Sequence, residues 1–70
     1  MRAHPLIAVL REERRTQGIS QSRLALRIGV HNAQVCQWEK GERRPMLDNF
    51  VAFANALGFE LELVRKGTTP

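Results

Sequence analysis

The segment from Gln21 to Glu39 constrains the fold of this chain most strongly, because its pattern fits two short amphipathic helices joined by a turn. Gly29 lies between the two halves, and glycine readily adopts the positive φ that a sharp turn requires. Ala25 is small at the place where the two helices would cross closely. Val35 and Trp38 are three residues apart, so they lie on one edge of the second helix. The pattern predicts a helix-turn-helix in which that edge faces the core.

Two further helices are expected, one on each side of this segment. The first begins at Pro5, which suits a first helical turn because the N–H that proline lacks has no helical partner there. It ends near Gly18. The last helix follows Pro45 and ends at Gly58. Ser20 is a good N-cap for the helix that begins after it.

The first and last helices each have an apolar side. These sides are formed by Leu6, Ile7 and Leu10 in the first helix and by Leu47, Phe50, Val51, Phe53, Ala54 and Leu57 in the last. A chain of 70 residues buries only about 60% of its unfolded surface, so association with a second copy would supplement a small core. The sequence predicts one compact all-α domain of four to five helices over residues 5–58.

The spacing of apolar residues changes after this domain. Apolar side chains then alternate with glutamates in the order Phe59, Glu60, Leu61, Glu62, Leu63. This is the spacing of a strand. A lone strand has no partner in a helical domain, so residues 59–66 are expected to pair with a second copy, with Phe59, Leu61 and Leu63 in the dimer interface. A short fifth helix is the alternative, because Glu and Leu are good helix formers. Residues 67–70 are expected to form a flexible tail.

Positive charge is concentrated in the middle third of the chain. The net charge is +4 and the isoelectric point is near 10.7, which favours a polyanionic partner. The basic residues between positions 14 and 44 are Arg14, Arg15, Arg23, Arg27, Lys40, Arg43 and Arg44, against only Glu39 and Glu42. Between positions 45 and 64 the charged residues are all acidic. A basic pole and a neutral-to-acidic pole are therefore expected.

The outer edge of the predicted third helix has side chains suited to base contact, namely Asn32, Ala33, Gln34 and Gln37. Asn and Gln amides can pair with adenine through two hydrogen bonds, and each good pair discriminates by roughly 1–3 kcal/mol. Arg43 and Arg44 follow closely and are suited to phosphate. The alternative is a solvated helix face next to an ordinary charged loop. The grouping of amides with arginines favours nucleic-acid binding.

Other classes of site are disfavoured. Cys36 is the only cysteine, which excludes an internal disulfide and fits a reducing compartment. His4, His31 and Cys36 lack the spacing of metal ligands, and no pattern gives Cys36 a catalytic base. We therefore expect no metal, no cofactor and no enzymatic activity. The chain has no apolar run of about 20 residues and no signal peptide at its start, so a cytoplasmic protein is expected.

An ordered set of positions extends over roughly residues 6–58: Leu10-Arg11, Arg14, Gly18-Ile19-Ser20-Gln21, Leu24-Ala25, Gly29-Val30, Val35, Trp38-Glu39, Gly41, Pro45, Leu47 and Ala56-Leu57-Gly58. In this set the chain resembles the lambda-repressor-like, or Cro/repressor-type (XRE), helix-turn-helix proteins. It departs from their usual pattern at Arg23, where an acidic residue is common, at His31, where Ser or Thr is common, and at Cys36, where Ser is common.

The resemblance implies a compact bundle of four or five helices whose third helix enters the DNA major groove. Base contacts are implied for Asn32, Ala33 and Gln37, with Gln34 as a further candidate. Phosphate contacts are implied for Gln21, Arg43 and Arg44, and positions near the turn and the loop add Arg23, His31 and Lys40. Arg14 and Glu39 match a structural salt bridge between the first and third helices, although Arg14 could instead be exposed.

The expected function is that of a sequence-specific regulator, a repressor, that binds double-stranded DNA as a homodimer. Two recognition helices would then enter successive major grooves about 34 Å apart. An alternative from another class is the antitoxin of a toxin–antitoxin pair, which would bind a protein toxin through the last helix and the C-terminal segment and would regulate its own operon. A third alternative is a helix-turn-helix used only for protein contacts.

Overall fold

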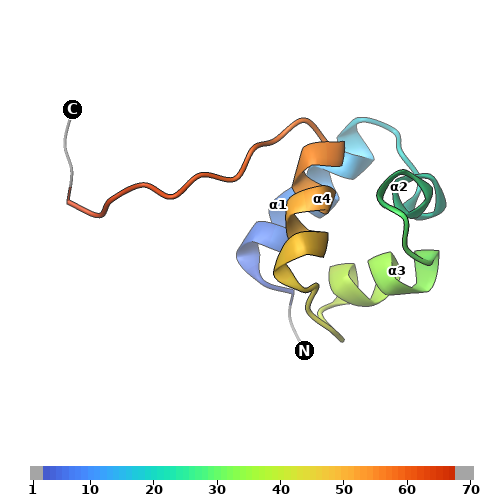
Figure 1. The fold of residues 1–70 in the computed structure, drawn as a ribbon. Helices are drawn as coiled ribbons and strands as arrows, with labels where there is room; N and C mark the ends of the chain where they lie inside the picture. Colours follow the sequence, from blue (N-terminus) through green and yellow to red (C-terminus); the bar gives the residue numbers. More distant parts are fainter. Residues whose placement is uncertain (1–2, 68–70) are drawn as a thin grey trace.

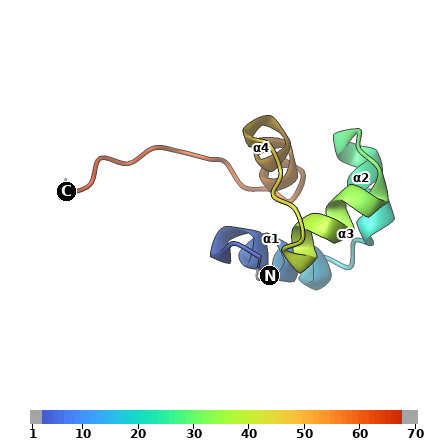
Figure 2. The same cartoon turned by 90° about the horizontal axis from the view of Figure 1, so that it is seen from below.

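The computed structural model describes residues 3–67, which form four helices (Figure 1). They are α1 (Pro5–Thr16), α2 (Gln21–Ile28), α3 (Asn32–Lys40) and α4 (Leu47–Ala56). α2 packs against both α3 and α4, and α1 packs against α3. The four predicted helices and the all-α fold are confirmed. α3 lies along the lower side of the molecule in Figure 1 and therefore faces the viewer in Figure 2.

The first two helices begin as the sequence predicts. Pro5 is the first residue of α1, and Ser20 is the N-cap of α2, where its Oγ accepts a hydrogen bond from the Arg23 backbone N–H at 3.0 Å. The cap of α1 was not predicted. His4 Nδ1 accepts a hydrogen bond from the Leu6 backbone N–H at 3.1 Å. Each of these side chains satisfies a backbone donor that has no partner within the helix.

Gly29 forms the turn between α2 and α3. Its φ is +77°, in the left-handed region, and the Val30 N–H beyond it donates to the Ala25 carbonyl at 3.0 Å. A Cβ built on Gly29 would meet no atom within 4 Å. The position therefore requires glycine for its backbone conformation, and neighbouring atoms impose no further constraint.

The core lies where the four helices meet. Its buried members are Ile7, Leu10, Ile19, Leu24, Ala25, Val35, Trp38, Phe53, Ala54 and Leu57. The rings of Trp38 and Phe53 lie 6.0 Å apart between centroids, in a tilted arrangement. This contact joins α3 to α4, and Val35 and Trp38 occupy the buried edge of α3 as predicted.

Leu6 and Leu47 belong to the predicted apolar sides of the first and last helices, yet they are 53% and 72% exposed. Leu6 directly precedes Ile7, which is only 3% exposed, so the two side chains lie in the same turn but on different sides of α1. Together with Pro45 and Phe50, Leu6 and Leu47 border an open, mainly apolar groove of about 320 Å³. Spacing along a helix identifies its apolar side, but it does not show how much of that side the neighbouring helices cover.

The segment after α4 leads away from the helices (Figures 1 and 2). Its start is fixed by the Phe59 N–H, which donates to the Ala54 carbonyl at 2.9 Å. Residues 59–65 form neither a strand nor the alternative fifth helix, and residues 59–67 are exposed. Strand pairing with a second copy stays a prediction. Of the predicted tail at 67–70, residues 68–70 lie outside the described residues. Every helix within residues 3–67 is too short or too polar to cross a bilayer.

Candidate nucleic-acid interface

The inner edge of α3 fixes the orientation of the helix. Val35, Trp38 and Glu39 on that edge are only 0%, 4% and 3% exposed. On the outer edge Asn32 and Ala33 are exposed, whereas Gln34 and Gln37 are half-buried. The candidate base-contacting residues therefore lie on the side of α3 that faces away from the core, although Gln34 and Gln37 are partly covered by neighbouring residues.

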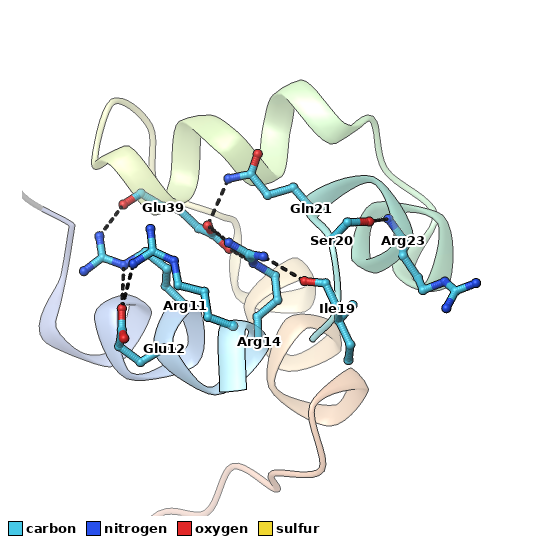
Figure 3. Close-up of polar contacts among 9 residues, drawn as sticks. Arg11, Glu12, Arg14, Ile19, Ser20, Gln21, Arg23 and Glu39 are labelled. Atoms are coloured by element: carbon cyan, nitrogen blue, oxygen red, sulfur yellow. Dashed lines mark hydrogen bonds and ion pairs between the residues drawn. The ribbon is translucent and has the colours of Figure 1, made fainter. Parts of the chain in front are cut away.

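A buried ion pair connects α3 to α1 (Figure 3). Arg14 donates from Nε to Glu39 Oε2 at 2.7 Å and from Nη2 to Glu39 Oε1 at 2.8 Å. Its Nη1 donates to the Ile19 carbonyl at 2.7 Å, which fixes the chain just before α2. Arg14 is 8% exposed. One guanidinium therefore links α1, the connection to α2, and α3 in a fixed geometry.

The pair is charged at neutral pH. Burial raises the pKa of the Glu39 carboxyl, but hydrogen bonds from Arg14 and Gln21 and the positive charge of Arg14 outweigh burial, so that this pKa lies below its ordinary value. The hydrogen bond to Glu39 raises the pKa of Arg14 above its ordinary value, against the opposing effect of burial. Both shifts favour the charged forms, so the ion pair supports α3 at neutral pH.

Gln21 belongs to this network as well. Its Nε2 donates to Glu39 Oε1 at 3.0 Å, and its amide oxygen points away from the ion pair (Figure 3). An amide oxygen only accepts hydrogen bonds, so it cannot bind phosphate. A phosphate contact at this predicted position therefore depends on the second N–H of Nε2 and on backbone N–H groups in the first turn of α2.

Two of the amides on α3 already have partners within the protein. Asn32 donates from Nδ2 to Ser22 Oγ on α2 at 2.8 Å. The His31 backbone N–H donates to Gln34 Oε1 at 3.0 Å. Gln34 is the third residue of α3, so this bond is half of a capping box. The pairing of His31 with Gln34 was not predicted from the sequence. One of the two lone pairs on the Gln34 oxygen is thus used at the start of α3.

The basic loop after α3 meets the amide-bearing edge at a groove of about 510 Å³. This groove is lined by Gln34, Gln37, Trp38, Arg43, Arg44, Met46 and Asn49. It brings together two predicted base contacts and two predicted phosphate contacts. Met46 and Asn49 were not predicted as site residues. The apolar pattern after Pro45 predicts a helix there, but it does not indicate that these two side chains lie beside the basic loop.

The remaining predicted site residues lie outside this groove. Arg23, His31 and Lys40 are exposed on α2, in the turn and at the end of α3. Phe59, Leu61 and Leu63 are 37%, 44% and 101% exposed on the C-terminal segment, beyond the other end of α4. Within residues 3–67 no three His, Cys, Asp or Glu side chains come together in a way that could hold a metal ion.

Comparison with known proteins places this arrangement in a family. The helix-turn-helix family model matches residues 10–64. The solution structure of the DNA-binding domain of the P22 c2 repressor is 30% identical and superposes with a TM-score of 0.74 over 86% of this chain and 79% of that chain. The crystal structure of the P22 c2 repressor with a synthetic operator is 29% identical, with a TM-score of 0.74 over 83% of this chain and 88% of that chain.

No match was found among curated proteins. The family match and both structural matches agree with the resemblance seen in the sequence. Because the family model covers more than half of the chain, membership rests on the whole domain and not on one motif. The fold and family are those of DNA-binding regulators. The chain thus belongs to the helix-turn-helix family and has the lambda-repressor-like fold of its DNA-binding proteins.

Proposed function

We propose that this protein is a transcriptional repressor that binds a specific double-stranded DNA sequence by inserting α3 into the major groove. The observation that supports this most strongly is the groove where Gln37 on the outer edge of α3 meets Arg43 and Arg44. Base-contacting and phosphate-contacting side chains must lie next to each other in this way, because bases and backbone are adjacent along a DNA groove.

The proposed roles follow from side-chain chemistry. Base contacts are assigned to Asn32, Ala33, Gln34 and Gln37, and phosphate contacts to Gln21, Arg23, His31, Lys40, Arg43 and Arg44. Gln34 keeps its amide N–H groups and one lone pair of its oxygen for a base, because the other lone pair accepts the hydrogen bond that caps α3. Gln37 has no such restriction, so it is the residue expected to contribute most to discrimination between bases.

The support beneath α3 favours this function. A major groove about 12 Å wide admits one helix. The Arg14–Glu39 pair and the contact between Trp38 and Phe53 fix the helix before any DNA arrives. Binding therefore requires little reordering of the protein, which reduces its entropic penalty. The P22 c2 repressor, 29% identical, has been crystallised with a synthetic operator, and this supports double-stranded DNA as the ligand.

A homodimer is proposed because its twofold axis would place two α3 helices in successive major grooves about 34 Å apart. The dimer interface is assigned to Phe59, Leu61 and Leu63, whose apolar side chains are exposed in a single copy. Sedimentation equilibrium would give the mass of a dimer for the parent and of a monomer for Leu61→Glu. A parent that stays monomeric when bound to a selected operator would contradict this assignment.

A second candidate function is that of an antitoxin, favoured by the exposed Leu6 and Leu47 beside the groove between α1 and α4. Such a surface suits a protein partner. A toxin encoded next to this gene would then co-purify in a stable complex, and Leu6→Asp/Leu47→Asp would release it. Purification of the protein without a toxin, under conditions in which both genes are expressed, would exclude this function.

The experiment that tests DNA binding is selection of bound duplexes from a random pool, followed by titration of three variants. Gln37→Ala should relax the preference at one base pair by roughly 1–3 kcal/mol. Arg44→Ala should weaken binding to all sequences alike and reduce the salt dependence. The matched control is Arg15→Ala, which removes the same charge from an exposed arginine already paired with Glu12 at 3.0 Å.

The salt dependence gives a quantitative check. Four basic phosphate contacts in each of two copies predict that log K falls against log [salt] with a slope of about −7. Arg44→Ala should reduce that slope by about two for a dimer, and Arg15→Ala should leave it unchanged. If Gln37→Ala and Arg44→Ala both bind the selected duplex as the parent does, the assigned interface is wrong.

A further inference from the structure

We infer that Ser22 is a specificity-determining residue, which acts by fixing the orientation of the Asn32 amide before it meets a base. This inference rests on the proposed DNA-binding function. Ser22 lies in the first turn of α2 and Asn32 is the first residue of α3, so their hydrogen bond spans the two helices of the motif. Asn32 Nδ2 donates to Ser22 Oγ at 2.8 Å.

The hydrogen bond to Ser22 determines which donors and acceptors of the Asn32 amide remain free for DNA. An asparagine amide has two N–H donors and one oxygen acceptor. One donor of Asn32 is used by Ser22, which leaves one N–H and the oxygen for a ligand. Adenine presents one acceptor and one donor, N7 and the N6 amino group, in the major groove, and an amide in this state can satisfy both. Rotation of the amide by 180° would exchange donor and acceptor and lose this match.

A DNA phosphate would fix the direction of the hydrogen bond. A serine hydroxyl has one donor and two acceptor positions, so by itself it could donate to Asn32 or accept from it. A phosphate only accepts, and therefore a Ser22 hydroxyl in contact with phosphate must donate to the DNA. It can then only accept from Asn32. Contact with the backbone at Ser22 thus selects the amide orientation that matches adenine at Asn32.

The side chains of Ser22 and Asn32 are both exposed, so a DNA ligand can reach them. Gln21, immediately before Ser22, donates to the buried Glu39 and so turns toward the protein interior. Ser22 is the residue of this turn that has a hydroxyl, and because its oxygen accepts from Asn32, its proton is free for phosphate. α2 thereby takes part in base selection, a role that phosphate contacts alone do not give it.

The test is a double-mutant cycle on the operator selected by the parent. Ser22→Ala should lower the preference for the selected base at one position by about tenfold, and this effect should vanish when Asn32 is already Ala. Ser22→Thr retains the hydroxyl and should restore the preference. Gln37→Ala serves as the control, because it should change a different base pair and combine additively with Ser22→Ala.

Each outcome has a definite meaning. If Ser22→Ala leaves every base preference unchanged, the inference is wrong, while the proposed function stands. Equal weakening on all sequences would show that Ser22 binds phosphate without orienting Asn32, and that also overturns it. A parent that selects no sequence would overturn the proposed function and the inference together. In the free protein, the Asn32 side-chain NH₂ resonances should shift in Ser22→Ala, and unchanged resonances would contradict the hydrogen bond itself.

Discussion

Replacement of Glu39 by Ala should be among the most destabilising changes that this protein can undergo at a polar position. Arg14 is 8% exposed in the parent protein, and the substitution leaves its guanidinium with only the Ile19 carbonyl as a hydrogen-bond partner. It also deprives Gln21 Nε2 of an acceptor. Removing one member of a buried pair costs about 3–5 kcal/mol, because the remaining charge stays buried without compensation.

This loss is large relative to the whole stability. A domain of this length is stable by about 4–10 kcal/mol, from roughly 0.05–0.15 kcal/mol per residue. Glu39→Ala is therefore expected to be unfolded in a substantial fraction of molecules at 37 °C. The double variant Arg14→Met/Glu39→Met should recover most of the loss, since it removes both charges and fills the space with apolar side chains.

Urea denaturation measures these differences. Trp38 is the only tryptophan and is buried, so its fluorescence reports the packing of α3, while far-UV circular dichroism reports all four helices. The control is Glu12→Ala, which removes two solvent-accessible ion pairs of Glu12, with Arg15 at 3.0 Å and with Arg11 at 3.6 Å. That change should cost only about 0.2–1 kcal/mol. If Glu39→Ala costs no more than Glu12→Ala, the buried pair does not have the role assigned to it.

Three further changes test other parts of the structure. The pKa of Glu39 is lowered in the folded state, so its contribution to the free energy of unfolding is complete above about pH 4.5 and declines as the pH falls towards the folded pKa. Glu39→Gln should flatten the stability profile below pH 4.5 in urea titrations, and an unchanged profile would contradict the shift. Gly29→Ala should cost about 1–2 kcal/mol through its φ of +77°, whereas Gly29→Asn should cost less. If Gly29→Ala and Gly29→Asn lose the same stability, the loss comes from packing of the added side chain and not from the backbone conformation. Phe53→Ala should cost about 3–5 kcal/mol because the side chain is 0% exposed, against almost nothing for Leu63→Ala at 101% exposure.

Local chemistry made much of the fold predictable. The turn at Gly29, the cap at Ser20 and the helix start at Pro5 depend on residues within a few positions of each other, and all three were predicted. The burial of Val35 and Trp38 followed from their spacing. Such features depend on backbone preferences and helical period, which are properties of short segments.

The extent of the core was harder to predict. Leu6 has the same apolar character and the same helix as Ile7, yet Leu6 is 53% exposed and Ile7 only 3%. Leu47 differs from Phe53 in the same way. Burial depends on whether a neighbouring helix covers the side of the helix on which a residue lies, and this is set by the crossing geometry of the helices. The apolar alternation in residues 59–65 likewise could not form a strand without a second chain.

The sequence by itself determined the four helices, the helix-turn-helix and the identity of the amides on the outer edge of α3. Only the tertiary structure decided which of their polar atoms have partners within the protein. Gln21 reaches Glu39 across 18 positions, and Asn32 reaches Ser22 across 10. The physical reason is that a hydrogen bond requires donor and acceptor to lie within about 3 Å of each other, and residues far apart in the chain meet at that distance only after the helices have packed.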